Sequence, residues 1–184
     1  MQEPELIRVD SGTDVILAFL YAGGTRKPKN EEIFGNTRLD KLLFLLEQET
    51  TLKKYLTEFN YEAYNYGPYS SEVFDAIQAL INAGLVKADS SPSEGFLDEA
   101  DRYQIETDVL DNISSPKETI VYSLTPEGEK VGSALFQTLS KEEQEQLISI
   151  KTKFNSISLR KLLQYVYRKY PSFTTESVIR EYVY

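Results

Sequence analysis

The segment 64–73, YNYGPYSSEV, constrains the fold of this chain more than any other. Its Gly-Pro pair marks a turn, and its serines followed by Glu72 are typical of a helix start. Apolar residues then recur at helical spacing up to Gly84: these are Val73, Phe74, Ile77, Leu80 and Ile81. Leu85-Val86 begins a strand, and the later segment 122–128, YSLTPEG, indicates a second strand leading into another helix.

This order of elements is typical of a winged helix-turn-helix domain. We therefore predict a mainly α protein with a small antiparallel β-sheet, consisting of a winged helix-turn-helix core and a helical C-terminal extension. The predicted winged-helix domain spans 1–139, with its wing at about 85–124. The extension spans 140–184 and packs on that domain.

Capping residues and apolar spacing predict the remaining elements. They are a helix capped by Asp10 or Ser11 and closed by Gly23-Gly24, a loop over 25–34, a helix from Asn36 or Thr37, a short helix over 50–56, an extended segment over 59–65, a helix from Thr125 to Leu139, one from Ser140 with Glu143 as its capping box, one from Ser156 or Ser158 to Pro171, and a last short helix over 175–182. The helix from residue 36 is apolar on more than one face, so we expect it at the centre of the core.

Three segments carry a resemblance to known families: RLDKLLFLL (38–46), YNYGPYS (64–70) and YSLTPEG (122–128). The chain resembles the YwgA-like family, a prokaryotic family without a settled activity. It is also similar to the related Panacea domain of SocA-like antitoxins, which has a KLxKLL helix and a YGP turn before a helix. The resemblance spans roughly residues 37–184, because the ending LLQYVYRKYPSFTTESVIREYV also looks YwgA-like. Similarity to the Panacea domain implies a protein that neutralises a toxin by binding it.

The composition removes most routes to catalysis. The chain has no cysteine and no histidine, which excludes thiolate nucleophiles, imidazole bases and ordinary zinc sites. We find no catalytic constellation, and the acidic group Asp98-Glu99-Asp101 favours a solvated loop over a metal site. We therefore expect no enzyme activity, no cofactor and no metal. The longest apolar run, 15–22, is short of the ~18 residues of a membrane helix, and the N-terminus lacks signal-peptide features, so we expect a cytoplasmic protein without a membrane span.

Charge is distributed unevenly along the chain. The net charge is −9, with +5 on residues 151–184 and −14 on the rest. The helix after the YGP turn has no basic residue, and the predicted wing, 88–122, has nine acidic residues against two basic ones. DNA binding by the usual winged-helix surface is therefore disfavoured. Candidate nucleic-acid contacts remain only in the basic segment: Lys151, Lys153, Arg160, Lys161, Arg168 and Lys169. We favour the alternative that these groups solvate an amphipathic helix and pair with the acidic body.

The tyrosine-rich turn is the main candidate surface for a protein partner. The alternative is that its rings fill the core, which we favour for Tyr64 and Tyr66, while Tyr69 is compatible with either role. The candidate interaction residues are Tyr66, Tyr69, Ser70, Glu72 and Asp75. We predict a non-enzymatic regulatory or protein-interaction module, antitoxin-like, with a protein partner. The alternative is a DNA-binding transcription regulator that uses the basic C-terminal helices, and a homodimer is compatible with both.

Overall fold

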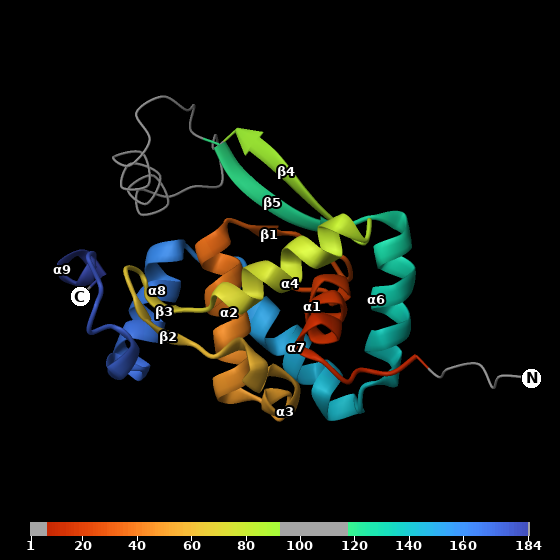
Figure 1. Ribbon diagram of the computed structural model, residues 1–184, viewed down its shortest axis with the longest axis horizontal. Coiled ribbons are helices and arrows are strands. Elements are labelled where there is room, and N and C mark those ends of the chain that lie inside the picture. The colour runs from red at the N-terminus through yellow and green to blue at the C-terminus, as the bar shows by residue number, and fades with distance from the viewer. Residues whose placement is uncertain (1–6, 93–117, 184) are drawn as a thin grey trace, which may run out of the picture.

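The computed structural model describes residues 7–92 and 118–183 (Figure 1). Its helices are α1 (Gly12–Tyr21), α2 (Asn36–Glu49), α3 (Lys53–Leu56), α4 (Ser71–Asn82), α6 (Pro126–Thr138), α7 (Lys141–Phe154), α8 (Leu159–Lys169) and α9 (Arg180–Val183), with 3-10 turns η1 (Thr57–Phe59) and η2 (Pro171–Phe173). Its strands are β1 (Ile33–Phe34), β2 (Glu62–Tyr64), β3 (Gly67–Tyr69), β4 (Val86–Pro92) and β5 (Glu118–Leu124). The prediction of a mainly helical protein with a small antiparallel sheet is confirmed.

The larger sheet has three antiparallel strands in the order β1-β5-β4. Strands β4 and β5 pair from Val86↔Leu124 to Pro92↔Glu118, and β1 pairs with the middle of β5. The two strands extend away from the helices as a ribbon (Figure 1). They are the two predicted strands, whereas residues 93–117 of the predicted wing lie outside the described residues.

Two helices form the centre of the core. Every residue of α1 from Val15 to Leu20 is buried, and so is every residue of α2 from Arg38 to Leu46. Helix α6 packs on α1, while α7 and α8 pack on α2. Helix α4 crosses in front of both central helices in Figure 1 and buries Val73, Ile77 and Leu80. The prediction that the second helix is central is confirmed, and α1 shares this position.

The predicted helix starts are confirmed by side-chain caps. A serine or threonine hydroxyl accepts a backbone N–H in the first turn of five helices, namely Ser11, Ser70, Thr125, Ser140 and Ser158. Ser140 and Glu143 form the predicted capping box, and Ser11 forms one with Asp14. Each such cap contributes about 1 kcal/mol, which is why these boundaries can be located from local sequence.

Two local predictions differ from the structure. The predicted loop 25–34 contains strand β1, whose pairing partner is far away in the chain. The last helix is shorter than predicted and begins at Arg180, after turns. Across the described ranges, no helix is both long and apolar enough to cross a membrane.

Candidate functional site

The hairpin of β2 and β3 presents the YGP segment at one side of the molecule. Tyr64 pairs with Gly67, which adopts φ +89°, a conformation that favours glycine. A Cβ at Gly67 would lie 2.8 Å from Cε1 of Tyr167 on α8. The turn is held from its other side by the Val178 N–H, which donates to the Asn65 carbonyl oxygen at 3.0 Å. Glycine is therefore required for both the turn and its close contact with α8.

A buried ion pair joins this hairpin to α2. Lys41 Nζ donates to Asp40 Oδ2 at 2.9 Å and to the Pro68 carbonyl oxygen at 2.6 Å. The side chains of Asp40 and Lys41 are each 2 % exposed. Burial raises the pKa of the Asp40 carboxyl, and the adjacent Lys41 charge opposes that shift. The helix 38–46 and the turn 64–70 are thus in direct contact, which positions β3 and the start of α4.

A row of aromatic rings runs from the hairpin onto α4. The ring centroids of Tyr64 and Tyr69 are 5.0 Å apart, and Tyr69 stacks on Phe74 at 5.7 Å with an interplanar angle of 22°. Tyr64 is 47 % exposed. Burial is the main cause that raises the pKa of the Tyr69 hydroxyl, the charge of the buried Asp40 is the next largest, and Tyr64, Asp75 and Glu72 make smaller contributions. Two carboxylates of α4, Glu72 and Asp75, are therefore close enough to Tyr69 to act on its hydroxyl.

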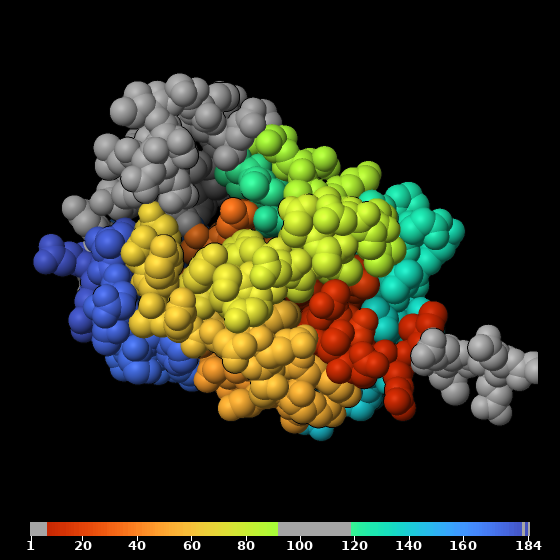
Figure 2. All heavy atoms as spheres, viewed as in Figure 1, coloured from red at the N-terminus to blue at the C-terminus, as the bar shows by residue number. Residues whose placement is uncertain are grey.

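The surrounding chain carries only negative charge. Residues 55–86 contain four carboxylates and no lysine or arginine. Glu62 on β2 and Asp75 on α4 are exposed. Figure 2 shows the hairpin in yellow and α4 in yellow-green next to each other on one face of the molecule. We call this the α4–hairpin face, made of Glu62, Tyr64, Tyr69, Glu72, Phe74 and Asp75.

The predicted interaction residues have different positions. Asp75 is exposed, whereas Tyr69 and Glu72 are half-buried. Tyr66 is half-buried against the core, and Ser70 is buried as the cap of α4, where its hydroxyl accepts the Val73 N–H. These last two positions therefore have a structural role in the described fold.

Sequence reasoning did not select Tyr64 as an interaction residue, although its ring is exposed. The signal that could have identified it is the period of two along β2, where Glu62 and Tyr64 face solvent and Ala63 does not. Phe74, one of the apolar residues at helical spacing in α4, stacks on Tyr69 and is only partly buried.

Among the predicted nucleic-acid residues, Lys151 is in the core. It is fully buried, and its Nζ donates to the carbonyl oxygens of Phe19, Leu20 and Ala22 at 2.7, 3.1 and 2.8 Å. These carbonyls lie at the C-terminal end of α1, where the helix leaves acceptors unpaired. Burial lowers the pKa of Lys151 to about 7. Its ammonium group is inaccessible to a nucleic acid, so Lys151 is removed from the predicted basic surface.

Two more of the basic groups are engaged with neighbours. Lys153 lies over the rings of Phe154 and Tyr165, at 4.9 and 5.1 Å from their centroids. Lys169 Nζ donates to Glu49 Oε1 at 2.9 Å and to the Tyr165 hydroxyl, and these partners raise its pKa. We favoured the interpretation that the basic groups solvate the helix and pair with acidic residues elsewhere in the protein. Lys169 agrees with it, because its ammonium pairs with Glu49 of α2.

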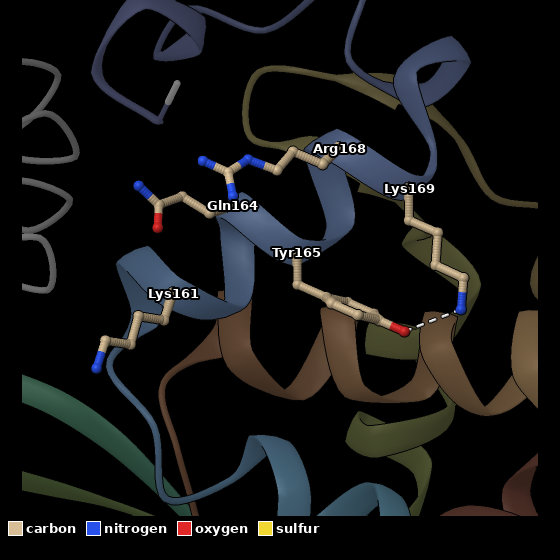
Figure 3. A pocket seen from close by; sticks show the side chains of 5 residues that line it. All are labelled: Lys161, Gln164, Tyr165, Arg168 and Lys169. Atoms are coloured by element: carbon tan, nitrogen blue, oxygen red, sulfur yellow. Dashed lines mark hydrogen bonds between the residues drawn. The ribbon is translucent and has the colours of Figure 1, made fainter.

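Besides Lys169, which is exposed but paired with Glu49, three basic side chains are exposed on α8: Arg160, Lys161 and Arg168. Lys161 and Arg168 line a surface hollow of about 390 Å³ together with Gln164, Tyr165 and Lys169 (Figure 3). The acidic group 98–101 lies outside the described residues. Within 7–92 and 118–183, the structure has no cluster of three or more carboxylates suited to a metal ion.

Comparison with known proteins identifies a family for this chain. No curated protein and no solved structure matches the chain. The family model described as antitoxin SocA-like, Panacea domain, matches residues 39–171. The match includes α2 from residue 39 onward, the YGP hairpin, α4, and α6 to α8, so it covers the contacts through which Lys41 and Tyr167 position the hairpin. The chain therefore belongs to the family of antitoxin SocA-like proteins with a Panacea domain.

Proposed function

We propose that this protein is a non-enzymatic, antitoxin-like regulatory module that binds another protein through the α4–hairpin face. The observation that carries this proposal is the row of Tyr64, Tyr69 and Phe74 in a segment, residues 55–86, that contains four carboxylates and no lysine or arginine. Aromatic residues are enriched among the residues that dominate protein–protein affinity. The family supports the proposal, because the matching model is described as antitoxin-like and similarity to such a domain implies binding to a toxin protein.

The same face specifies the chemistry of the partner. Carboxylates at Glu62, Glu72 and Asp75 favour a cationic segment. Tyrosine rings also attract lysine and arginine through their π faces, with about 0.5–1 kcal/mol per contact at exposed sites. The partner segment that fits this face is therefore basic, with at least one apolar side chain to cover the rings.

The winged-helix assignment is part of the proposal. The order α1, β1, α2, α4, β4, β5 and the pairing of β1 with the β4–β5 ribbon support it. In that assignment α4 is the recognition helix, and its Glu72 and Asp75 repel phosphate. The division of the chain at residue 139, a cytoplasmic location and a homodimer stay predictions.

The DNA-binding alternative has one supporting observation, which is the exposure of Arg160, Lys161 and Arg168 on α8. Three side chains neutralise few phosphates, whereas specific DNA-binding proteins make roughly 6–10 phosphate contacts. The acidic body opposes even this contribution. We therefore place protein binding first.

The experiment that tests the proposal is a capture assay from the native host with four baits: the wild-type chain, Tyr64→Ala, Asp75→Lys and the control Glu145→Lys. Glu145 is exposed on α7, away from the α4–hairpin face, and its reversal changes the net charge by the same amount. We expect one stoichiometric protein on the wild-type and Glu145→Lys baits and its loss from the other two. Capture that is equal on all four baits, or no stoichiometric protein on any, contradicts the proposal.

A further inference from the structure

The outer side of α8 has a second surface with different chemistry. Lys161, Gln164, Tyr165, Arg168 and Lys169 line the hollow of about 390 Å³. Gln164, Tyr165, Arg168 and Lys169 follow Lys161 by 3, 4, 7 and 8 residues, and this helical spacing places all five along one side of α8 (Figure 3). The opposite side of α8 is buried through Leu162, Leu163 and Val166. The helix is therefore fixed by its apolar side and presents these polar groups at defined positions.

On one wall of the hollow, the positive charge of Lys169 is neutralised by a carboxylate. The Glu49 carboxylate accepts hydrogen bonds from Lys169 Nζ at 2.9 Å, from the Tyr165 hydroxyl at 2.9 Å and from the Tyr170 hydroxyl at 2.9 Å. Figure 3 shows the Tyr165 ring directed toward Lys169 and away from Lys161. In this network the negative charge of Glu49 offsets the positive charge of Lys169, so Lys169 adds no net charge to the hollow. The hydrogen bonds to Glu49 also fix the positions of the Tyr165 and Lys169 side chains.

The other wall is positively charged. Lys161 and Arg168 are exposed, and Figure 3 shows the Arg168 guanidinium beside the Gln164 amide, on the side away from Lys169. Within the described part of the chain, no ion pair engages Lys161. No carboxylate is among the residues that line the hollow. The surface thus offers an ammonium, a guanidinium fork and an amide N–H group on a protein with a net charge of −9.

These donors match the oxygen atoms of a phosphate group. A guanidinium binds phosphate through two parallel hydrogen bonds, and an ammonium adds a point charge. The volume lies in the range of small-ligand sites, which is about 300–1,000 Å³. We propose that Gln164 and Arg168 hydrogen-bond the phosphate group of a small phosphorylated ligand, and that the Lys161 ammonium, which points in another direction in Figure 3, adds its positive charge to the site. This site lies on α8, apart from the α4–hairpin face, and does not depend on the function proposed above.

Titration of the ¹⁵N-labelled full-length chain, followed by two-dimensional NMR, tests this proposal. The probes are inorganic phosphate, adenosine monophosphate, adenosine and a short duplex DNA in a phosphate-free buffer. We expect saturable shifts of the 161–169 amide signals with inorganic phosphate and with the monophosphate, and none with adenosine. A tighter Kd for the monophosphate than for inorganic phosphate identifies a phosphorylated organic compound as the ligand, and equal values identify free phosphate.

Matched variants assign the binding to these side chains. Lys161→Gln and Arg168→Gln each remove one exposed charge, and we expect each to raise the phosphate Kd about tenfold. Lys141→Gln removes an exposed charge on α7 and should leave the Kd unchanged. Equal Kd values for all three variants, shifts with adenosine alone, no saturation with phosphate, or α8 shifts with duplex DNA only would each overturn the proposal.

Discussion

At the scale of single residues, Lys151 combines deep burial with an unusual titration. Its ammonium group is the donor for three carbonyls at the end of α1, and no solvent reaches it. Burial lowers its pKa from 10.5 to about 7, although the nearby Glu31 carboxylate acts in the opposite direction. The chain has no histidine and no cysteine, and Lys151 is a side chain expected to change charge near pH 7 in the folded protein.

The pH dependence of stability follows from this shift. Between about pH 7 and 10 the unfolded state retains the Lys151 proton while the folded state loses it. The unfolded state therefore binds more protons, and the free energy of unfolding rises with pH by at most about 1.4 kcal/mol per unit. Urea denaturation from pH 7 to 9.5 measures this rise. In Lys151→Met the profile should be flat, and a wild-type profile that falls over this range contradicts the assignment.

Gly67 provides a second prediction at this scale. Gly67→Ala should lower the free energy of unfolding by about 3 kcal/mol, because it adds a contact with Tyr167 to an unfavourable backbone conformation. Gly84→Ala is the matched control, since Gly84 also has a positive φ but its Cβ would meet no atom within 4 Å. Urea denaturation of both variants separates the cost of the unfavourable backbone conformation, which both share, from the cost of the contact with Tyr167, which only Gly67→Ala has. Equal losses would show that the contact with α8 adds nothing.

At the scale of elements, the buried pair Asp40–Lys41 couples α2 to β3. Lys41→Met should lower the free energy of unfolding by about 3–5 kcal/mol, because Asp40 then lacks its buried counter-charge. The double variant Asp40→Asn, Lys41→Met should recover part of this loss. Lys53→Met, an exposed change on α3, should cost less than about 0.5 kcal/mol. Equal losses for the single and double variants would contradict an ionic role for the pair.

Elements governed by local chemistry could be predicted from the sequence, whereas those governed by distant contacts could not. The starts of α4, α6 and α7 follow from Ser70, Thr125 and Ser140, whose hydroxyls bind N–H groups within the same turn. Strand β1 exists because Ile33 and Phe34 pair with β5, which no local pattern encodes. In the candidate site, the acidic character of α4 was evident from the sequence. The burial of Lys151 was not, because a lysine on an amphipathic helix is usually exposed.

At the scale of the whole molecule, the separation of charge governs binding to nucleic acids. We expect no binding of random-sequence duplex DNA in a fluorescence-anisotropy titration at ~50 mM salt, because α4 is acidic and Lys151 and Lys169 are engaged within the protein. Binding that is steeply weakened at ~200 mM salt, and lost in the variant Arg160→Glu, Lys161→Glu, Arg168→Glu, would contradict this expectation and favour the DNA-binding alternative.

The α4–hairpin face is the surface through which we propose that the whole protein acts. The most direct measurement is the Kd of the purified captured partner for wild-type protein, Tyr64→Ala, Asp75→Lys and Glu145→Lys, by isothermal titration calorimetry. We predict that Tyr64→Ala and Asp75→Lys each weaken binding by about 2 kcal/mol, roughly thirtyfold in Kd, while Glu145→Lys leaves it unchanged. Equal Kd values for all four proteins would contradict the claim that this face binds the partner.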